Sequence, residues 1–510
     1  MSPAHSNATA AAALESDVPI VAAASSRSLF LRIFPSIMLP MFLASVDGTI
    51  VAAALPSIAS SLGHVELISW IVVAYLVAAT IAAPVYGRLG DVLGRRRMLF
   101  VALAMTLVAH VLCAASISMT MLIAARVLQG LGGGGLMTLS QALIGQSVPP
   151  RERAKYQGYM ASVFVCSSMF GPVAGGWLTQ QFGWRSVFTI TIPLVLLAIG
   201  LAFRLPRATA GAGRVRFDFL GTLLFATFIA PALMALEQAR RFELASLPLA
   251  VGLAVVAAVS LVLLLRQERR AASPLLPIAF LRQSAIWRTD TMAACVGATL
   301  VSMITFLPIY FTVARGAGPG QAGLLMLPLT ALIAVGSMAT GRLMSATGRT
   351  AIIPSCGLPV VVVLLLVLAL AGPSMTLAQL PWLLGAIALF TGTAMPVVQI
   401  TVQMLAGPKQ LGAAAASVQF SRSIGAAVGT AVVGAVLFAT LAALDPDTAN
   451  LFARIVQQGP GAVAGLPVDR VAQLQVEIGR AFQAAFLTIA AFAATGAALA
   501  WSIPVRRIQD

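Results

Sequence analysis

Two charged residues interrupt long apolar stretches of the sequence. Asp47 lies in SVDGTIVAAALP, and Arg126 lies in LIAARVLQG. A charged side chain at membrane depth costs about 2.5–3.5 kcal/mol on insertion scales, so such residues are functional candidates. A carboxylate that moves between an apolar environment and the field of an arginine can bind and release a proton. The two residues therefore predict either a proton-carrying site or a static ion pair between two helices.

Helix geometry predicts that these two residues lie at a similar depth. Asp47 lies about 22 Å above the inner end of its helix, at about 1.5 Å of rise per residue. Arg126 lies about 10 Å below the outer end of its own helix. Both fall in the outer half of a hydrocarbon core about 30 Å thick, so they can meet if their helices are neighbours. His110, in another apolar segment, is interpreted as a hydrogen-bonded packing residue rather than a proton carrier.

Composition supplies the elements that must position these residues. Hydrophobic residues make up 59% of the 510-residue chain, charged residues make up 9%, and the mean hydropathy is +0.95. Soluble domains have about 45–50% apolar and about 25% charged residues. Fourteen apolar segments are long enough to span a bilayer as helices. We therefore expect an all-α integral membrane protein with fourteen spans.

Two similar nine-residue segments indicate that the apolar segments form two blocks. GRLGDVLGR at 87–95 and GRLMSATGR at 341–349 share five positions, and each follows the second helix of a six-helix block. Repeated halves are a common construction of secondary transporters. The predicted organisation is a cytoplasmic tail at 1–30, a six-helix half at 31–203, two inserted helices with cytoplasmic linkers at 204–286, a second six-helix half at 287–503, and a tail at 504–510.

The basic excess is explained by membrane topology. The chain carries 32 Lys and Arg against 16 Asp and Glu, and most of the basic residues fall in the predicted inner loops and tails. This bias places both termini in the cytoplasm and excludes nucleic acid as the reason for the charge. The three histidines and four cysteines have no metal-ligand spacing, so no metal is expected. The excess of Arg over Lys and the abundance of alanine indicate a bacterial plasma membrane.

Glycine patterns mark two of the helices. Gly130, Gly132 and Gly135 fit GxGxxG, but no strand precedes them, so a dinucleotide site is excluded. These glycines instead predict close approach of a neighbouring helix. In SSMFGPVAGGWL, Pro172 removes a backbone hydrogen bond and permits a bend. The segment predicts either tight packing or a moving gate.

These motifs together resemble the fourteen-helix drug:proton antiporter branch of the major facilitator superfamily, over roughly residues 30–505. In this sequence Ala52 replaces the usual asparagine of the helix-1 pattern, and Ser167 replaces the leading glycine of the antiporter motif. The matches are Gly87, Leu89, Asp91, Gly94, Arg95 and Arg96 in the loop motif; Leu122, Arg126, Gln129 and Gly130 in helix 4; Gly171, Pro172, Gly175 and Gly176 in the antiporter motif; Asp47, Thr49, Leu55 and Pro56 in helix 1; and Arg422, Gly425 and Gly429 in helix 13.

The resemblance implies alternating access coupled to inward proton movement. Asp47 would be the coupling carboxylate and Arg126 its electrostatic partner. Arg422 would be either a third polar residue of the core or a packing group. Asp91 would face the N-terminus of the helix near Leu411–Ala413, held by Arg95, and so latch the inner gate.

The same resemblance implies what the protein works with. The first, fourth, ninth and twelfth spans would line the cavity. Protons and a small-molecule substrate are the expected partners, in a lipid bilayer, with the proton-motive force in place of a cofactor. We expect a functional monomer, and the need for a periplasmic adaptor protein stays open.

Several large apolar residues bear on the identity of the substrate. Candidates for a soft aromatic cavity surface that would suit a lipophilic cation are Met38, Phe42, Met137, Phe306 and Tyr310, which are otherwise ordinary packing or lipid-facing residues. The leading hypothesis is export of lipophilic or cationic drugs in exchange for protons. The alternatives are a proton-coupled exporter of one metabolite or siderophore, and, more remotely, a polytopic membrane enzyme or sensor.

Overall fold

The computed structural model describes residues 26–64, 67–206, 218–239, 247–271, 274–275, 278–458, 468–505 and 507. Residues 1–25 of the predicted N-terminal tail, most of the linker 204–216 and part of the C-terminal tail lie outside the described residues. The first described helix begins at Ser26, earlier than the predicted boundary at residue 31.

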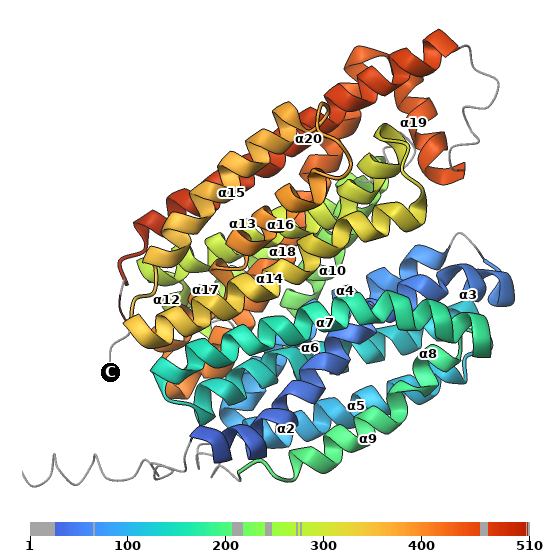
Figure 1. The fold of residues 1–510 in the computed structure, drawn as a ribbon. Coiled ribbons are helices and arrows are strands. Elements are labelled where there is room, and N and C mark those ends of the chain that lie inside the picture. The colour runs from blue at the N-terminus through green and yellow to red at the C-terminus, as the bar shows by residue number, and fades with distance from the viewer. Residues whose placement is uncertain are drawn as a thin grey trace, which may run out of the picture.

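The chain folds into two helical halves (Figure 1). A smaller group of helices connects them in the sequence. The N-terminal half contains α2 (Ser26–Asp47), the 3₁₀ segment η2 (Ile50–Ala54), α3 (Leu55–Leu62), α4 (Ile68–Leu93), α5 (Arg95–Ala114), α6 (Met119–Ser147), α7 (Pro150–Phe182), α8 (Ser186–Thr189) and α9 (Thr191–Ala202). The inserted region contains α10 (Phe219–Ala239), α11 (Leu247–Arg270) and α12 (Ile278–Leu281).

The C-terminal half repeats this arrangement and ends with the long helices α18 and α20, with the short α19 between them in the sequence (Figure 1). It contains α13 (Ser284–Ile309), the π-helical turn η5 (Tyr310–Ala314), α14 (Pro319–Thr347), α15 (Ile352–Ala371), α16 (Leu380–Thr391), α17 (Ala394–Ala406), the 3₁₀ turn η6 (Pro408–Gln410), α18 (Leu411–Leu444), α19 (Pro446–Gln458) and α20 (Val468–Ser502).

These helices have the length and composition of a multi-pass membrane protein. Among the described residues, 11 helices are long and apolar enough to cross a bilayer, and Ser186–Ala202 and Phe219–Ala235 are shorter apolar helices. The all-α fold is therefore confirmed, whereas the count of fourteen spans stays a prediction.

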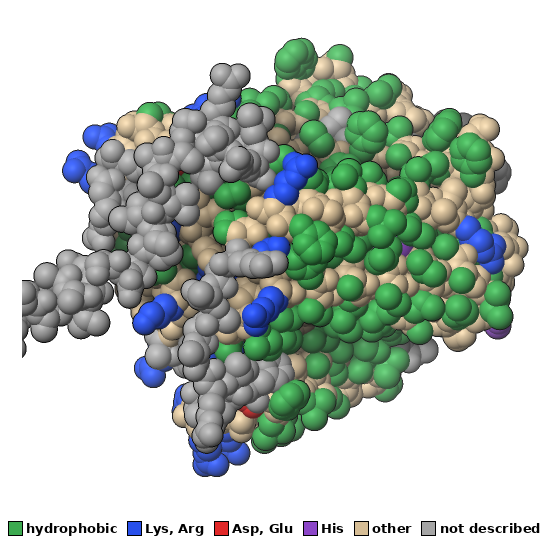
Figure 2. All heavy atoms as spheres, turned by 90° about the horizontal axis from the view of Figure 1, so that it is seen from below, with side chains coloured by type: hydrophobic (Ala, Val, Ile, Leu, Met, Phe, Trp, Pro, Cys, Tyr) green, Lys and Arg blue, Asp and Glu red, His purple; other side chains and the backbone are tan. Residues whose placement is uncertain are grey.

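The outer surface is apolar, as a lipid-facing surface requires. Figure 2 shows hydrophobic side chains over most of one face, with Lys and Arg gathered mainly toward one end. On this scale an exposed apolar surface is unusual for a soluble monomer. Exposed hydrophobic residues include Val101 and Val108 on α5, Leu196 and Leu197 on α9, and Trp501 on α20.

The inserted pair lies at the junction of the two halves. Helices α10 and α11 pack against each other, and α10 also contacts α4 and α18. Phe225 of α10 is buried, and its ring lies 5.3 Å from that of Phe420 on α18. The inserted helices therefore cover one side of the seam between the halves.

The predicted outer loop at 442–481 is largely helical. Helix α19 and the beginning of α20 occupy most of it, and Asp445 forms an ion pair with Arg470. The hydrogen bond from Arg470 lowers the pKa of the Asp445 carboxyl below its usual range. Thr448 donates a hydrogen bond to Glu477, which ties α19 to α20.

Close helix packing depends on individual glycines. A Cβ atom at Gly336 on α14 would lie 1.9 Å from the main-chain oxygen of Leu389 on α16, whereas a Cβ at Gly200 on α9 would meet nothing within 4 Å. Because overpacking costs about 1–3 kcal/mol, Gly336→Ala should lower the thermal unfolding temperature of the purified protein. Gly200→Ala is the matched control and should leave it unchanged or raise it. Equal melting temperatures for both variants would contradict this packing.

Candidate functional site

Asp47 lies where the first membrane helix is interrupted. Helix α2 ends at Asp47, and the chain continues through η2 into α3. Two glycines of α7 make room for this break: a Cβ at Gly171 would lie 2.1 Å from Thr49 Oγ1, and one at Gly175 would lie 2.3 Å from the Ile50 oxygen. A Cβ at Gly176 would have only one neighbour, Ala53, at 4.0 Å. Gly171 and Gly175 of the predicted antiporter motif therefore hold the segment that follows Asp47.

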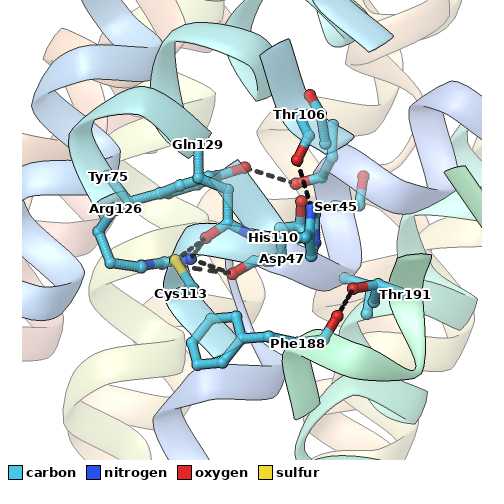
Figure 3. Close-up of polar contacts among 12 residues, drawn as sticks. Ser45, Asp47, Tyr75, Thr106, His110, Cys113, Arg126, Gln129, Phe188 and Thr191 are labelled. Atoms are coloured by element: carbon cyan, nitrogen blue, oxygen red, sulfur yellow. Dashed lines mark hydrogen bonds and ion pairs between the residues drawn. The ribbon is translucent and has the colours of Figure 1, made fainter. Parts of the chain in front are cut away.

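The Asp47 carboxylate is buried against His110 of α5 (Figure 3). The distance from Asp47 Oδ1 to His110 Nε2 is 3.0 Å, and the two side chains are 1% and 0% exposed. The other ring nitrogen of His110, Nδ1, lies 2.7 Å from the main-chain oxygen of Thr106. The Oδ2 atom of Asp47 is buried without a partner among the described residues.

Arg126 reaches the same place from α6 but contacts the main chain of Asp47. Its NH1 and NH2 groups lie 3.3 and 3.4 Å from the Asp47 carbonyl oxygen, and Nε donates to the Ile71 oxygen at 3.0 Å. The guanidinium lies 4.3 Å from the centre of the Tyr75 ring, a cation–π contact. The predicted meeting of the first and fourth spans is therefore present, without a direct bond between guanidinium and carboxylate.

Gln129 connects Arg126 to His110 and fixes the hydrogen-bond directions. NH1 of Arg126 donates to Gln129 Oε1 at 2.6 Å, so the Gln129 amide nitrogen must point the other way, toward His110 Nε2 at 3.1 Å. An amide nitrogen only donates, and a carbonyl oxygen such as that of Thr106 only accepts. Nδ1 of His110 therefore carries a hydrogen, whereas Nε2 has two candidate partners, the Gln129 amide nitrogen and Asp47 Oδ1.

This contact must contain a hydrogen. Asp47 Oδ1 and His110 Nε2 lie 3.0 Å apart, so a hydrogen on one of the two atoms is needed for a hydrogen bond between them. Arg126 is satisfied by carbonyl oxygens in either case. The geometry is therefore that of a carboxyl and an imidazole that share one hydrogen.

A cavity of 650 Å³ lies between the two halves, next to this site. Helices α2, α6, α13 and α17, which are the predicted first, fourth, ninth and twelfth spans, all contribute to its lining, together with α4, α7, α10, α14 and α18. Gly130, Gly133 and Gly134 of α6 pack closely on Tyr75 and Ala79 of α4, as the glycine pattern predicts.

The predicted aromatic lining of this cavity needs correction. Met38, Phe42, Phe306 and Tyr310 are not among its lining residues. They pack instead in the cores of the two halves; Tyr310, for example, is 1% exposed and packs against Phe482 and Phe486 with tilted and edge-on rings. Their helical positions turn them away from the seam. The candidate Met137 does line the cavity, and the other large apolar residues of the lining include Phe164 and Phe420.

Tyr75 separates the cavity from the contact between Asp47 and His110. It lines the cavity, its ring covers Arg126, and its hydroxyl donates to the Ala44 oxygen at 2.8 Å. Asp47 and His110 are not lining residues. The cavity and the buried carboxyl are therefore separate places in this conformation.

At one end of the seam the two halves are joined through Asp91. Its Oδ1 and Oδ2 accept the main-chain N–H groups of Gly412 and Ala413 at 2.9 and 3.0 Å, at the start of α18. Arg95 donates to Asp91 Oδ1 at 2.6 Å and also to the Pro408 oxygen at 3.2 Å. The predicted contact of Asp91 with Leu411–Ala413, supported by Arg95, is thus present.

Glycines let the backbones meet at this contact. A Cβ at Gly87 would lie 2.6 Å from the Gly412 oxygen, and one at Gly412 would lie 2.2 Å from the Gly87 oxygen. Gly94, with φ of 98°, makes the turn between α4 and α5. Arg96 points away from the seam and donates to the Phe203 oxygen at 3.0 Å.

The second nonamer makes the equivalent contact without the acid. A Cβ at Gly341 on α14 would lie 2.2 Å from the Ala154 oxygen on α7. The position that corresponds to Asp91 is occupied by Ser345. The two nonamers therefore lie at pseudo-symmetric positions along the seam between the halves. Of these two loops, only the first places a carboxylate at the contact.

Sequence reasoning missed His110 as a member of the site. One signal was present in the sequence: His110 is a histidine inside an apolar segment, in a chain with only three. Its contact with Asp47, 63 positions away, needs the packing of α5 against α6, which no local pattern specifies.

Two helical halves around a central cavity, with a buried carboxyl group beside it, have the architecture of a membrane transporter. The chain belongs to the Major Facilitator Superfamily, whose family model matches residues 37–430. It is a multi-pass membrane transporter and not an enzyme.

Similar proteins carry names of the same kind. An uncharacterised MFS-type transporter of Mycobacterium tuberculosis is 34% identical over 79% of this chain. The matched part is only 59% of that relative's own length. The multidrug transporter protein MdtP of Bacillus subtilis is 28% identical, over 81% of this chain and 76% of its own. The solved proton:xylose symporter XylE has a TM-score of 0.60 at 14% identity, covering 94% of this chain and 97% of that one, and shows the fold alone.

The hydrogen-bond directions can be tested without a substrate. Because the chain has only three histidines, histidine-selective ¹⁵N NMR should resolve His110, assigned by its loss in His110→Asn. We expect a hydrogen on Nδ1, because this atom faces the Thr106 carbonyl oxygen. Thr106→Val, which keeps the main-chain acceptor, is the matched control and should leave the signal in place. A ring whose only hydrogen lies on Nε2 would contradict the contact with Thr106.

The latch can be tested by amide exchange. In Asp91→Asn the side chain keeps one acceptor oxygen and gains an amide nitrogen, which is a donor. It can therefore accept only one of the two main-chain N–H groups of Gly412 and Ala413. Loss of one hydrogen bond should accelerate hydrogen–deuterium exchange at Gly412 and Ala413 by about tenfold. Asp218→Asn, which removes a similar carboxylate at the start of α10, should leave that exchange unchanged. Unaltered exchange at Gly412 and Ala413 in Asp91→Asn would contradict the inference that the Asp91 side chain stabilises this contact between the halves.

Proposed function

We propose that this protein exports lipophilic or cationic compounds from a bacterial cell in exchange for protons, by alternating access. The observation that carries the proposal is the contact between Asp47 and His110: a buried carboxyl in a proton-holding arrangement, adjacent to a cavity but separate from it. The relatives that are named multidrug transporters support export of lipophilic compounds.

The orientation follows from the basic residues near the Asp91 end. Arg88, Arg95, Arg96 and Arg97 lie at this end in sequence, and the positive-inside rule assigns such a cluster to the cytoplasm. Both termini are then cytoplasmic, in a bacterial plasma membrane. The latch between Asp91 and α18 closes the cytoplasmic end, so the described conformation faces outward.

In this scheme the outward-facing state loads the proton. Asp47 holds it against the Nε2 acceptor of His110. When the halves rock and the latch opens, the break between α2 and η2 allows the Asp47 side chain to leave His110. Arg126 then favours the ionised carboxylate, and the proton leaves toward the cytoplasm.

The proton gradient supplies the energy for export. When one proton is exchanged for one uncharged molecule, one charge crosses the membrane. At 100 mV this contributes about 2.3 kcal/mol, which corresponds to about fifty-fold accumulation. Neither a cofactor nor a second subunit has a role in this scheme, which works with a single chain in the bilayer. A periplasmic adaptor protein would add only a route onward for the exported compound.

The experiment is substrate-driven proton flux in inverted membrane vesicles. Ethidium, an uncharged lipophilic dye and anilinonaphthalene sulfonate are each added to vesicles of the wild type, Asp47→Asn and Asp218→Asn at matched expression. We expect at least one compound to move protons in the wild type and in Asp218→Asn. Asp47→Asn should lose at least nine-tenths of that flux, because asparagine cannot exchange a proton.

Two outcomes would contradict the proposal. If none of the three compounds moves protons in wild-type vesicles, the proposed export of lipophilic compounds is wrong. Full flux in Asp47→Asn would leave export standing but place the coupling at another residue.

A further inference from the structure

The central cavity has an unusual charge. Of its lining residues in the described part of the chain, Arg422 of α18 is the only one with a charged side chain. The remaining polar lining is made of neutral groups, among them Gln141, Gln157 and Gln399. A cavity lined in this way has a positive potential, because nothing in its lining balances the guanidinium.

The guanidinium of Arg422 is held in place without being neutralised. NH2 donates to Gln419 Oε1 at 2.9 Å, one turn earlier on the same helix. The carbon atom CZ lies 5.3 Å from the centre of the Phe164 ring, which belongs to α7 of the other half. Among the described residues, no carboxylate forms an ion pair with Arg422. Its side chain is only partly buried, so it can meet a ligand in the cavity.

Close packing against α13 fixes the position of Arg422. A Cβ at Gly297 would lie 2.4 Å from the Arg422 oxygen and 3.1 Å from its Cγ. This glycine lets α13 and α18 approach each other where the arginine leaves the helix. The charge is therefore presented from a rigid helix pair rather than from a mobile loop.

The carboxyl groups of Asp47 and Asp290, which lie on helices that line the cavity, are not available to a ligand. Asp47 is 1% exposed, engaged by His110 and shielded from the cavity by Tyr75. Asp290 on α13 is 6% exposed and is not a lining residue. A cation in the cavity would meet one positive charge and no negative one, whereas an anion would find a partner.

We propose that the substrates of this cavity are lipophilic organic anions, and that Arg422 binds their charged group. A sulfonate, carboxylate or phosphate can accept two parallel hydrogen bonds from a guanidinium. The apolar body would lie against Met137, Phe164 and Phe420, which supply the large hydrophobic surface of the lining. This inference rests on the proposed export function and narrows the substrate from lipophilic or cationic compounds to anions.

Anion export has an electrical consequence. When one proton enters and one monovalent anion leaves, two elementary charges move inward in each cycle. When one proton is exchanged for one monovalent cation, no net charge moves. The membrane potential alone would therefore drive anion export and would not drive the exchange of ethidium for one proton.

The decisive comparison uses two ions of nearly equal shape and opposite charge. Tetraphenylborate and tetraphenylphosphonium are titrated into purified full-length protein in detergent, and binding is measured by calorimetry. The variants are Arg422→Gln, which removes the charge; Arg422→Lys, which keeps it; and Arg342→Gln. Arg342 is an exposed arginine outside the lining of the cavity, so its variant controls for the loss of one positive charge.

Neither ion has an oxygen or nitrogen atom that could accept a hydrogen bond, so only its charge distinguishes the two at Arg422. We expect the wild type to bind tetraphenylborate at least tenfold more tightly than tetraphenylphosphonium. The preference should disappear in Arg422→Gln, persist in Arg422→Lys and be unchanged in Arg342→Gln. Each of three results would overturn the inference: tighter binding of tetraphenylphosphonium, the same preference in Arg422→Gln, or no binding of either ion.

The binding test and the flux test fail independently. If tetraphenylborate binds through Arg422 but no compound moves protons, anion binding stands and proton-coupled export falls. If ethidium moves protons while tetraphenylborate does not bind, export stands and the anion assignment falls. In vesicles that export anilinonaphthalene sulfonate, an imposed potential without a pH gradient should accelerate that export, and an unchanged rate would also overturn the inference.

Discussion

The rest of the site depends on how the buried guanidinium of Arg126 is satisfied. It receives two main-chain oxygens, those of Asp47 and Ile71, a side-chain oxygen of Gln129 and the face of the Tyr75 ring. A buried charge is tolerated only when its hydrogen bonds are complete. Because neutral groups complete them here, the Asp47 carboxyl is not needed as a counter-ion and can hold a proton beside His110. A direct ion pair would instead favour a permanently ionised carboxylate.

This arrangement needs glycine at several points, because each partner must come unusually close. Gly130 and Gly133 bring Tyr75 onto α6, and Gly171 brings the break after Asp47 onto α7. The same device operates at the seam, where Gly87 and Gly412 allow two backbones to touch beside the Asp91 latch. Packing between two rigid halves is bistable rather than continuously deformable. A small set of contacts at one end can therefore decide which way the cavity opens.

The sequence predicted those parts of the molecule that depend on long patterns or on motifs. The hydropathy of the helices, the depth of Asp47 and Arg126, the echo at Gly341 and the partner of Asp91 all follow from periodicity or from the resemblance. Side-chain direction across the seam does not. Tyr310 and Phe306 look like cavity residues by type, yet they face the core of their own half. His110 looks like packing, yet it contacts Asp47, since that contact depends on the rotation of α5 against its neighbours.

In the proposed exchange, separation of the Asp47 carboxyl from the cavity limits how proton and substrate can be coupled. If both competed for one carboxylate, only a cation could be exchanged, because binding would require the charge that the proton removes. Here Tyr75 lies between the cavity and Asp47, and Arg422 supplies the charge on the cavity side. Coupling must then pass through the helices, as a shared preference of the proton and the substrate for different conformations of the same seam. Such coupling does not require a particular charge on the substrate. The charge of the cavity lining can therefore determine whether anions or cations bind.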